Sequence, residues 1–392
     1  MADGLFKRLV VAVPNGARRV LSAEMSARAT GFTFLGTVLI VLMHVPCQWS
    51  SSCFSVQIAH WVKSYFSVLA VPMFFMLSGL MLGKNMTDAR WYRKAVGKRM
   101  WTLLVPYLLV NTIYVPFVLY YHCRLGLGEW PSGGPGFDFY TISRLYGLTP
   151  FSMPACNAFW YVRNLLLLVL VSPVLAYFIR RSLFSAVFFV ISVLLISSCA
   201  LRFSTGIWSC FFYDFVNAKG VFFFTFGIFL SQWVWKFMAE VHFLPGMLFF
   251  VLGVILRGTA LSYETSILSF ALLILGLWSV LPAWGLPVFL AGTCFAVYAF
   301  HQLFVALLQF VHFRGDWVVL QLFICYIGPA VIVFFFQKFF PRCASIVLGG
   351  RSMRSSEQSA SGTSTSACAG DCGTTRGMHD SPRERIGDTP RA

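Results

Sequence analysis

Three ionisable side chains of this sequence lie within or at the end of long apolar stretches. His44 ends the run TFLGTVLIVLMHVP, Arg163 lies inside FWYVRNLLLLVLVSPVL, and His301 lies inside TCFAVYAFHQLF. Histidine exchanges a proton near neutral pH, whereas arginine stays charged and stabilises anions or a developing negative oxygen. Ionisable groups in hydrocarbon are costly and therefore mark functional sites. The three together predict proton-transfer chemistry beside an anion-binding group.

Each of these residues also has a structural interpretation. His44 is compatible with a histidine resting at a membrane interface. Arg163 is compatible with a side chain that snorkels outward beside the aromatic pair Trp160 and Tyr161. His301 is compatible with a bond to a backbone carbonyl of a neighbouring helix. All three are expected at a similar depth on the outer side of the membrane, which favours one shared site over three unrelated explanations.

The composition sets the elements that must position these side chains. The chain has 392 residues, of which 58% are hydrophobic and only 11% charged. Soluble domains do not carry this balance, and a membrane-spanning helix needs roughly 20 mainly apolar residues. We predict an all-α polytopic membrane protein with about ten transmembrane helices, near 30–46, 62–83, 101–121, 158–179, 183–201, 219–236, 243–257, 265–282, 286–310 and 317–340.

The distribution of charge predicts the orientation. Most of the 30 Lys and Arg residues fall in segments that lie inside when the N-terminus is cytoplasmic, so both termini are predicted to be cytoplasmic. The predicted parts are a basic cytoplasmic N-terminal segment (1–29), a transmembrane domain (30–351) and a disordered Ser/Thr/Gly-rich cytoplasmic tail (352–392). The basic stretch 90–100 indicates contact with the lipid bilayer surface, and no nucleic-acid partner is predicted.

Several classes of function are disfavoured. All 14 Asp and Glu residues map to termini, loops or helix ends, which argues against a proton-coupled transporter with a buried carboxylate. The chain has no phosphate-binding or dinucleotide-binding motif and no His-Glu-x-x-His sequence. No metal site is predicted, since no set of residues has the spacing of metal ligands. Gly79 and Gly83, four residues apart, favour close packing between helices.

Seven ordered sequence blocks carry a family resemblance: TVLIVLMHVP, VPMFFMLSGLMLG, KRMWTLLVPYLL, FWYVRNLLLLVLVSPVL, FFFTFGIFLSQ, TCFAVYAFHQLF and IVLGGR. Each block alone is a weak signal, but the ordered set is fairly specific and extends over nearly all of residues 30 to 351. In this order the blocks resemble the acyltransferase-3 family of integral-membrane acyltransferases.

The resemblance implies a ten-span O-acyltransferase of the bacterial inner membrane, which is the family's usual location. Such an enzyme takes an acyl group, often acetyl, from cytoplasmic acetyl-CoA or another acyl-CoA and uses no metal. The acceptor is a hydroxyl of an extracytoplasmic carbohydrate or lipid-linked glycan, so the outcome is O-acetylation of a polysaccharide. On this basis His44 is the expected catalytic base, and the expected substrate-binding residues are Arg163, His301, Trp160, Ser78 and Tyr298.

One position departs from the family pattern. The family usually has an arginine eleven residues before the histidine, where this chain has Thr33, and the nearest preceding arginine is Arg28. A helix places Arg28 about 7.5 Å further from the histidine. A catalytically inactive relative is therefore one alternative that remains open. A transporter or flippase of a lipid-linked glycan is another, since its polar outer cavity would use the same residues for binding. The sequence does not predict the oligomeric state.

Overall fold

The computed structural model describes residues 23–46, 54–84, 86, 91–125, 139–149, 153–203, 217–240, 243–259, 262–281, 288–311 and 317–350. The predicted tail (352–392) and residues 1–22 of the predicted N-terminal segment lie outside these ranges. Within the ranges there is no β-strand, and the β-type pairing is a single bridge between Tyr146 and Pro154. The predicted all-α class is confirmed.

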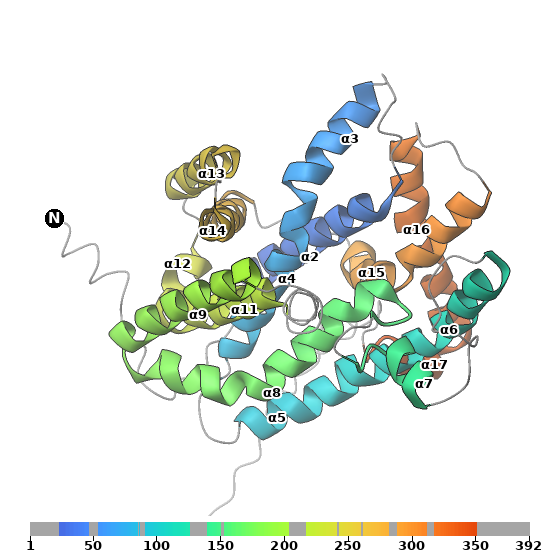
Figure 1. Cartoon of the computed structure of the whole chain (residues 1–392), viewed down its shortest axis with the longest axis horizontal. Helices are drawn as coiled ribbons and strands as arrows, with labels where there is room; N and C mark the ends of the chain where they lie inside the picture. The colour runs from blue at the N-terminus through green and yellow to red at the C-terminus, as the bar shows by residue number, and fades with distance from the viewer. Residues whose placement is uncertain are drawn as a thin grey trace, which may run out of the picture. The chain divides into compact units, whose positions relative to one another are not determined.

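The helices follow one another along the chain as shown in Figure 1. They are α2 (Ala23–His44), α3 (Phe54–Tyr65), η1 (Ser67–Leu69), α4 (Ala70–Gly83), α5 (Trp91–Arg99), η2 (Met100–Leu104), α6 (Val105–Leu125), α7 (Phe139–Leu145), η3 (Asn157–Phe159), α8 (Trp160–Arg181), α9 (Leu183–Phe203), α11 (Ala218–Trp233), α12 (Trp235–Ala239), α13 (Phe243–Gly258), α14 (Tyr263–Val280), α15 (Val288–Phe310), α16 (Val318–Phe339) and α17 (Pro341–Val347).

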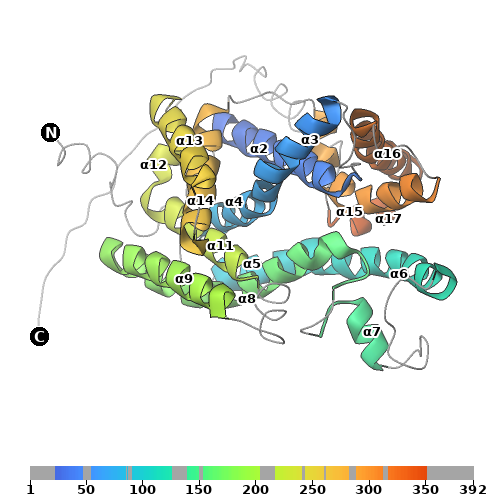
Figure 2. The same cartoon turned by 45° about the horizontal axis from the view of Figure 1, so that its top comes forward.

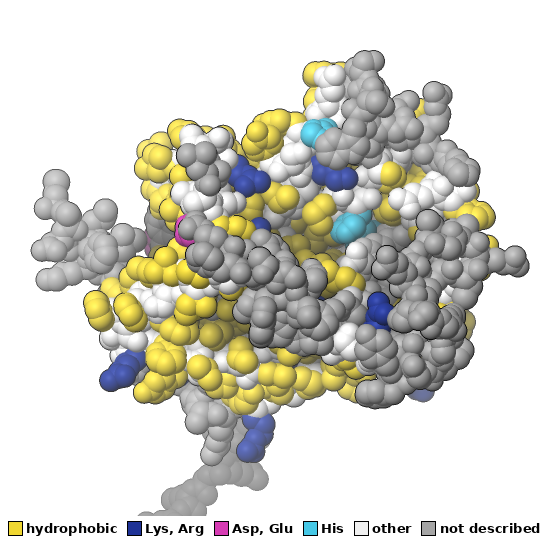
Figure 3. Space-filling model, in the orientation of Figure 1, with side chains coloured by type: hydrophobic (Ala, Val, Ile, Leu, Met, Phe, Trp, Pro, Cys, Tyr) yellow, Lys and Arg dark blue, Asp and Glu magenta, His cyan; other side chains and the backbone are white. Residues whose placement is uncertain are grey.

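Helix length and hydropathy identify a multi-pass membrane protein. In the described part of the chain, 8 helices are long and apolar enough to cross a membrane. The two other predicted spans are the helices α11 and α13, of 16 residues each. At 1.5 Å per residue each is about 24 Å long, shorter than the roughly 30 Å hydrocarbon core. Hydrophobic side chains cover much of the face in Figure 3, as expected for contact with lipid.

The first helix begins earlier than the predicted boundary at residue 30. α2 starts at Ala23, and Arg28 is buried within it. The Arg28 guanidinium forms an ion pair with Glu24 at 2.8 Å and donates to the carbonyl oxygens of Ala239 and Glu240, each at 3.1 Å. Because these groups satisfy the charge, the helix extends through a basic segment that hydropathy alone assigns to the cytoplasm.

The α5–α6 helix changes its winding directly after Arg99. Residues Met100–Leu104 form a π-helical turn, η2, between α5 and α6. Pro106 follows in the first turn of α6 and has no amide N–H, so the carbonyl of Thr102 lacks its usual donor four residues later. A π-turn is a common adjustment at such a point and is frequent at functional sites. This turn positions Arg99 and Leu103 at the pocket described below.

Glycines allow α4 and α11 to approach closely. These helices lie side by side in Figures 1 and 2. A Cβ atom added at Gly79 would lie 2.1 Å from the carbonyl oxygen of Phe224, and one at Gly227 would lie 2.1 Å from that of Met76. No larger residue fits at either position without moving a backbone. The close packing that the sequence predicted for Gly79 is confirmed.

Candidate active site

The two histidines predicted from separate spans meet in the structure. His44 is the last residue of α2, and its Nδ1 atom lies 3.3 Å from the Nε2 atom of His301 on α15. The ring centroids are 5.0 Å apart. His301 is completely buried, whereas His44 is partly exposed. The α2 and α15 helices therefore bring together two proton-exchanging side chains that are 257 residues apart in the chain.

Backbone carbonyls fix the orientation of both rings. The Nδ1 atom of His301 lies 3.1 Å from the Val297 oxygen and 3.0 Å from the Tyr298 oxygen. The Nδ1 atom of His44 lies 2.9 Å from the Ile40 oxygen. The carbonyl contact expected for His301 is present, but the carbonyls belong to its own helix.

A lysine lies next to this histidine pair. Lys63 on α3 donates from Nζ to the carbonyl oxygen of Val45, the residue after His44, at 3.1 Å. The ammonium group thereby places a positive charge at the end of α2. Lys63 has no role that could be predicted from sequence, because the packing of α3 over the end of α2 leaves no trace in local sequence.

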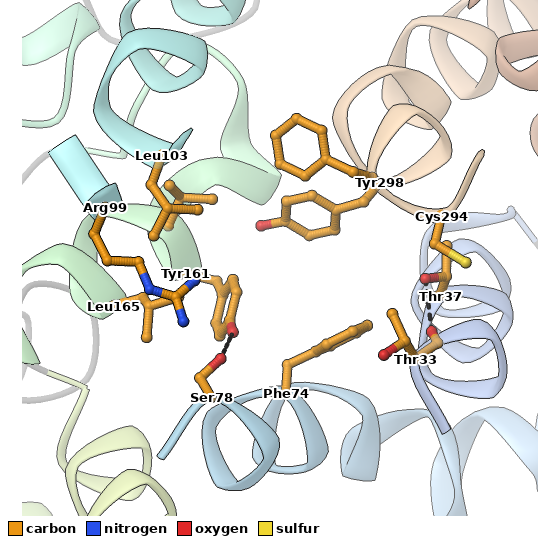
Figure 4. Close-up of a pocket in the computed structure, with 12 residues that line it drawn as sticks. Thr33, Thr37, Phe74, Ser78, Arg99, Leu103, Tyr161, Leu165, Cys294 and Tyr298 are labelled. Carbon is orange, nitrogen blue, oxygen red and sulfur yellow. Dashed lines mark hydrogen bonds between the residues drawn. The ribbon is translucent and has the colours of Figure 1, made fainter. Parts of the chain in front are cut away.

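A pocket of about 170 Å³ lies among α2, α4, α5, α8 and α15 (Figure 4). Aromatic and aliphatic side chains form much of its lining, with the Arg99 guanidinium on one side and the Thr33 and Thr37 hydroxyl groups on the opposite side. The lining residues are Thr33, Thr37, Phe74, Ser78, Arg99, Leu103, Tyr161, Val162, Leu165, Cys294, Phe295 and Tyr298.

Arg99 provides the pocket with a positive charge. Its guanidinium points toward Tyr161 and Ser78, whose oxygens are 3.0 Å apart (Figure 4). It makes no hydrogen bond or ion pair with the residues that the structure describes. Sequence analysis placed Arg99 in a basic stretch at the lipid surface. The available signal was its position at the start of a span, directly before the sequence MWTLLVP.

Thr33 stands at the pocket wall opposite Arg99 in Figure 4. Its hydroxyl donates to the carbonyl oxygen of Ala29 at 2.8 Å, and the Thr37 hydroxyl donates to that of Thr33 at 2.9 Å. Arg28 does not line this pocket, because α12 and Glu24 hold its side chain. Thr33, at the position where the resemblance leads one to expect an arginine, thus lines the pocket. The arginine that lines the pocket in this chain is Arg99, from α5.

Arg163 bonds to the protein itself. Its Nη1 atom donates to the Gly147 carbonyl oxygen at 2.7 Å, and the side chain is only 6% exposed. Two further hydrogen bonds between a side chain and the backbone hold the neighbouring segment. Cys156 N donates to Asn111 Oδ1 at 2.9 Å, and Tyr107 OH donates to the Tyr146 carbonyl oxygen. We call these six residues the loop clamp. Within it, burial raises the pKa of the Cys156 thiol to about 12.

The remaining predicted site residues divide between pocket and packing. Ser78 and Tyr298 line the pocket, and the Tyr298 hydroxyl donates to the Ala158 carbonyl oxygen. The ring centroids of Tyr298 and His301 are 6.5 Å apart, so this pocket residue lies beside the histidine pair. Trp160 does not line the pocket and packs near Phe75, with ring centroids 6.5 Å apart.

Comparison with known proteins identifies the family. A family model described as an acyltransferase domain matches residues 33–337, which is well over half of the chain. The chain belongs to the acyltransferase-3 family. The match begins at Thr33. It includes the histidine pair, His44 and His301, and also the two arginines Arg99 and Arg163. No curated protein and no solved structure matches this acyltransferase-3 chain.

Among the residues described, no group of three His, Cys, Asp or Glu side chains could hold a metal ion.

Proposed function

We propose that this acyltransferase-3 protein is a membrane O-acyltransferase. It moves an acyl group, foremost acetyl, from a cytoplasmic acyl-CoA to a hydroxyl of an extracytoplasmic or lipid-linked carbohydrate. The observation that carries the proposal is the histidine pair, which lies beside the pocket residue Tyr298, together with a pocket arginine that forms no hydrogen bond or ion pair with the described residues. A bacterial inner membrane with both termini in the cytoplasm is the location that we propose.

His44 acts as the general base. A carbohydrate hydroxyl is a poor nucleophile at neutral pH, and removal of its proton during attack accelerates the reaction by about 10² to 10⁴. The hydroxyl oxygen bonds to the thioester carbonyl carbon, the carbon–sulfur bond breaks, and the protonated His44 returns the proton to the departing CoA sulfur. His44 suits this role because it is the partly exposed member of the histidine pair.

Arg99 binds an anionic group of the acyl donor. Alternate spans cross a membrane in the same direction, so the start of α5 and the start of α2 lie on one face, which the predicted topology places in the cytoplasm. A donor that enters from this face meets the Arg99 guanidinium first. Thr37 lies seven residues before His44, about 10 Å along α2, so the acyl end of a bound donor extends toward the histidine pair.

The geometry favours different roles for two residues that the sequence assigned to substrate binding. Arg163 donates to Gly147, which supports a structural role in the loop clamp. Trp160 packs in the core beside Phe75. Ser78 and Tyr298 stay in the proposal as pocket residues.

Mass spectrometry of surface polysaccharide and lipid-linked glycans tests the proposed function. We compare cells that carry the wild-type protein, the His44→Ala variant and a deletion. Acyl transfer predicts that ester-linked acyl groups are present only with the wild-type protein, while the amount of surface glycan is the same in all three.

Two outcomes contradict the proposal. Loss of the whole glycan from the surface in the deletion cells would indicate a flippase. An unchanged set of acyl groups in all three strains would indicate an inactive relative. Immunoblotting of the membrane fraction verifies that His44→Ala reaches the wild-type level.

A further inference from the structure

His301 presents a lone pair to His44. The Nδ1 atom of His301 lies within 3.1 Å of two carbonyl oxygens, those of Val297 and Tyr298. Carbonyl oxygens only accept hydrogen bonds, so Nδ1 must carry the proton. In a neutral imidazole the other nitrogen is then an acceptor, and here Nε2 is the atom that faces His44.

The same reasoning fixes the proton on His44. Its Nδ1 atom lies 2.9 Å from the Ile40 carbonyl oxygen and 3.3 Å from the His301 Nε2 atom. Both neighbours are acceptors, so the His44 Nδ1 atom carries the proton and shares it between them. The Nε2 atom of His44 then has the lone pair, and it is the only ring nitrogen of the pair that bonds to no described residue.

The other charged and titratable groups around the histidine pair do not take over this orienting role. Lys63 on α3 bonds to the Val45 carbonyl, and Tyr298 on α15 directs its hydroxyl to the Ala158 carbonyl. No Asp or Glu in the described part of the chain bonds to either ring. In serine hydrolases a carboxylate orients the catalytic imidazole. Here the group in that place is a second imidazole.

We infer that His301 is a positioning residue, which together with the Ile40 carbonyl oxygen holds His44 in the tautomer with its proton on Nδ1 and thereby leaves Nε2 free as the base. The inference rests on the proposed function and replaces the substrate contact that the sequence assigned to His301. When His44 Nε2 takes the hydroxyl proton, the Nδ1–H donor gains positive charge, and its bond to the neutral His301 acceptor strengthens. His301 accepts this bond without touching the substrate.

Two substitutions at His301 separate the orienting bond from packing. His301→Gln keeps an acceptor near the Nε2 position, because the glutamine Oε1 atom reaches about as far as Nε2. His301→Asn is shorter and keeps only a group near the Nδ1 position, beside the carbonyls of Val297 and Tyr298. Both are neutral polar residues of similar character, so the glutamine variant is the matched control for the asparagine variant.

The first readout is the tautomer of His44, measured by nitrogen-15 NMR on the full chain in lipid nanodiscs with labelled histidine. The chain has 7 histidines, and the His44→Ala spectrum identifies the His44 signals. We expect a protonated Nδ1 on His44 in the wild-type and His301→Gln proteins, and a mixture of tautomers in His301→Asn. A protonated Nδ1 of unchanged population in His301→Asn overturns the inference.

The second readout is acyl transfer from radiolabelled acetyl-CoA to the glycan fraction extracted from deletion cells. We expect His301→Asn to lower kcat by about 10²-fold, with the KM for acetyl-CoA unchanged, and His301→Gln to recover at least a tenth of the wild-type kcat. Equal kcat losses in the two variants overturn the inference in favour of packing. Full transfer by His44→Ala would instead contradict the proposed function, whatever the tautomer measurement shows.

Discussion

The pocket around Arg99 and the loop clamp around Arg163 use the same side chain in opposite ways. Arg163 is buried and donates to the Gly147 carbonyl oxygen at 2.7 Å. Arg99 points into the pocket and bonds to none of the residues that the structure describes. A charged group in or near hydrocarbon is stabilised by the protein or by a ligand. The contrast assigns Arg163 to stability and Arg99 to binding.

The largest effect is expected from Arg99→Gln. Loss of one charge-assisted hydrogen bond, worth about 1.5 to 3 kcal/mol, raises the KM for acetyl-CoA by about 10- to 100-fold. We expect the thermal unfolding temperature to stay at the wild-type value, because the guanidinium bonds to no described residue. Radiolabel transfer at varied acetyl-CoA measures KM, and Arg99→Lys, which keeps the charge, is the control. An unchanged KM would remove Arg99 from the donor site.

Arg163→Gln is expected to show the reverse pattern. Removing the donor leaves the buried Gly147 oxygen without its 2.7 Å partner, which costs about 1 to 3 kcal/mol of unfolding free energy. Thermal unfolding in nanodiscs measures this loss, and Arg163→Lys, which keeps a charged donor, is expected to lose less. The KM for acetyl-CoA in the protein that remains folded should match the wild type. A raised KM with normal stability would return Arg163 to substrate binding, as the sequence predicted.

Two buried cysteines report on the same two regions. Cys294 lines the pocket, whereas Cys156 belongs to the loop clamp. Because burial holds the Cys156 pKa near 12, its thiolate fraction at pH 8 is about one in 10⁴ and it should resist alkylation.

We expect a small thiol reagent such as methyl methanethiosulfonate to modify Cys294 roughly tenfold faster than Cys156 in the native protein, and CoA to slow only the Cys294 reaction. Peptide mass spectrometry measures both rates in one sample, and labelling of the unfolded chain is the control. Equal protection of both cysteines by CoA would mean that the ligand does not distinguish the two regions.

Thr33→Arg in the Arg99→Gln background is expected to give the smallest effect. Thr33 faces Arg99 across the pocket, so an arginine there restores a positive charge on the opposite wall. We expect the KM for acetyl-CoA to fall by a few-fold relative to Arg99→Gln alone, since the charge returns at a different distance from the ligand. Thr33→Gln in the same background is the neutral control. Equal KM values for the two double variants would contradict a shared electrostatic role.

The sequence predicted the helices better than the polar contacts. Among the described residues each predicted span is mainly helical, because roughly 20 apolar residues can satisfy their backbone in a bilayer only as a helix. His44 and His301 could be predicted to share a depth, since both fall in the outer half of their predicted spans, and they meet at 3.3 Å. The helix α2 begins before residue 30, which hydropathy does not indicate because it does not register an arginine that is neutralised by Glu24 and two carbonyls.

The two arginines show why the remainder was not accessible from sequence. The partner of Arg163 is a backbone carbonyl, and a carbonyl has no sequence signature. Arg99 lies in a stretch of positive charge that the topology rule explains, and its position directly before MWTLLVP marks the start of a span without showing where its side chain points. Only the packing of five helices around one pocket reveals which basic side chain points inward.

One assay tests the central claim most directly. Purified protein in nanodiscs is given radiolabelled acetyl-CoA and the glycan fraction of deletion cells, and the radiolabel that reaches an ester on the glycan is measured. The account predicts base-labile label on the glycan with the wild-type protein and none with His44→Ala at any donor concentration. With Arg99→Gln it predicts the wild-type rate only at saturating donor. Equal transfer by the wild-type and His44→Ala proteins would contradict the account.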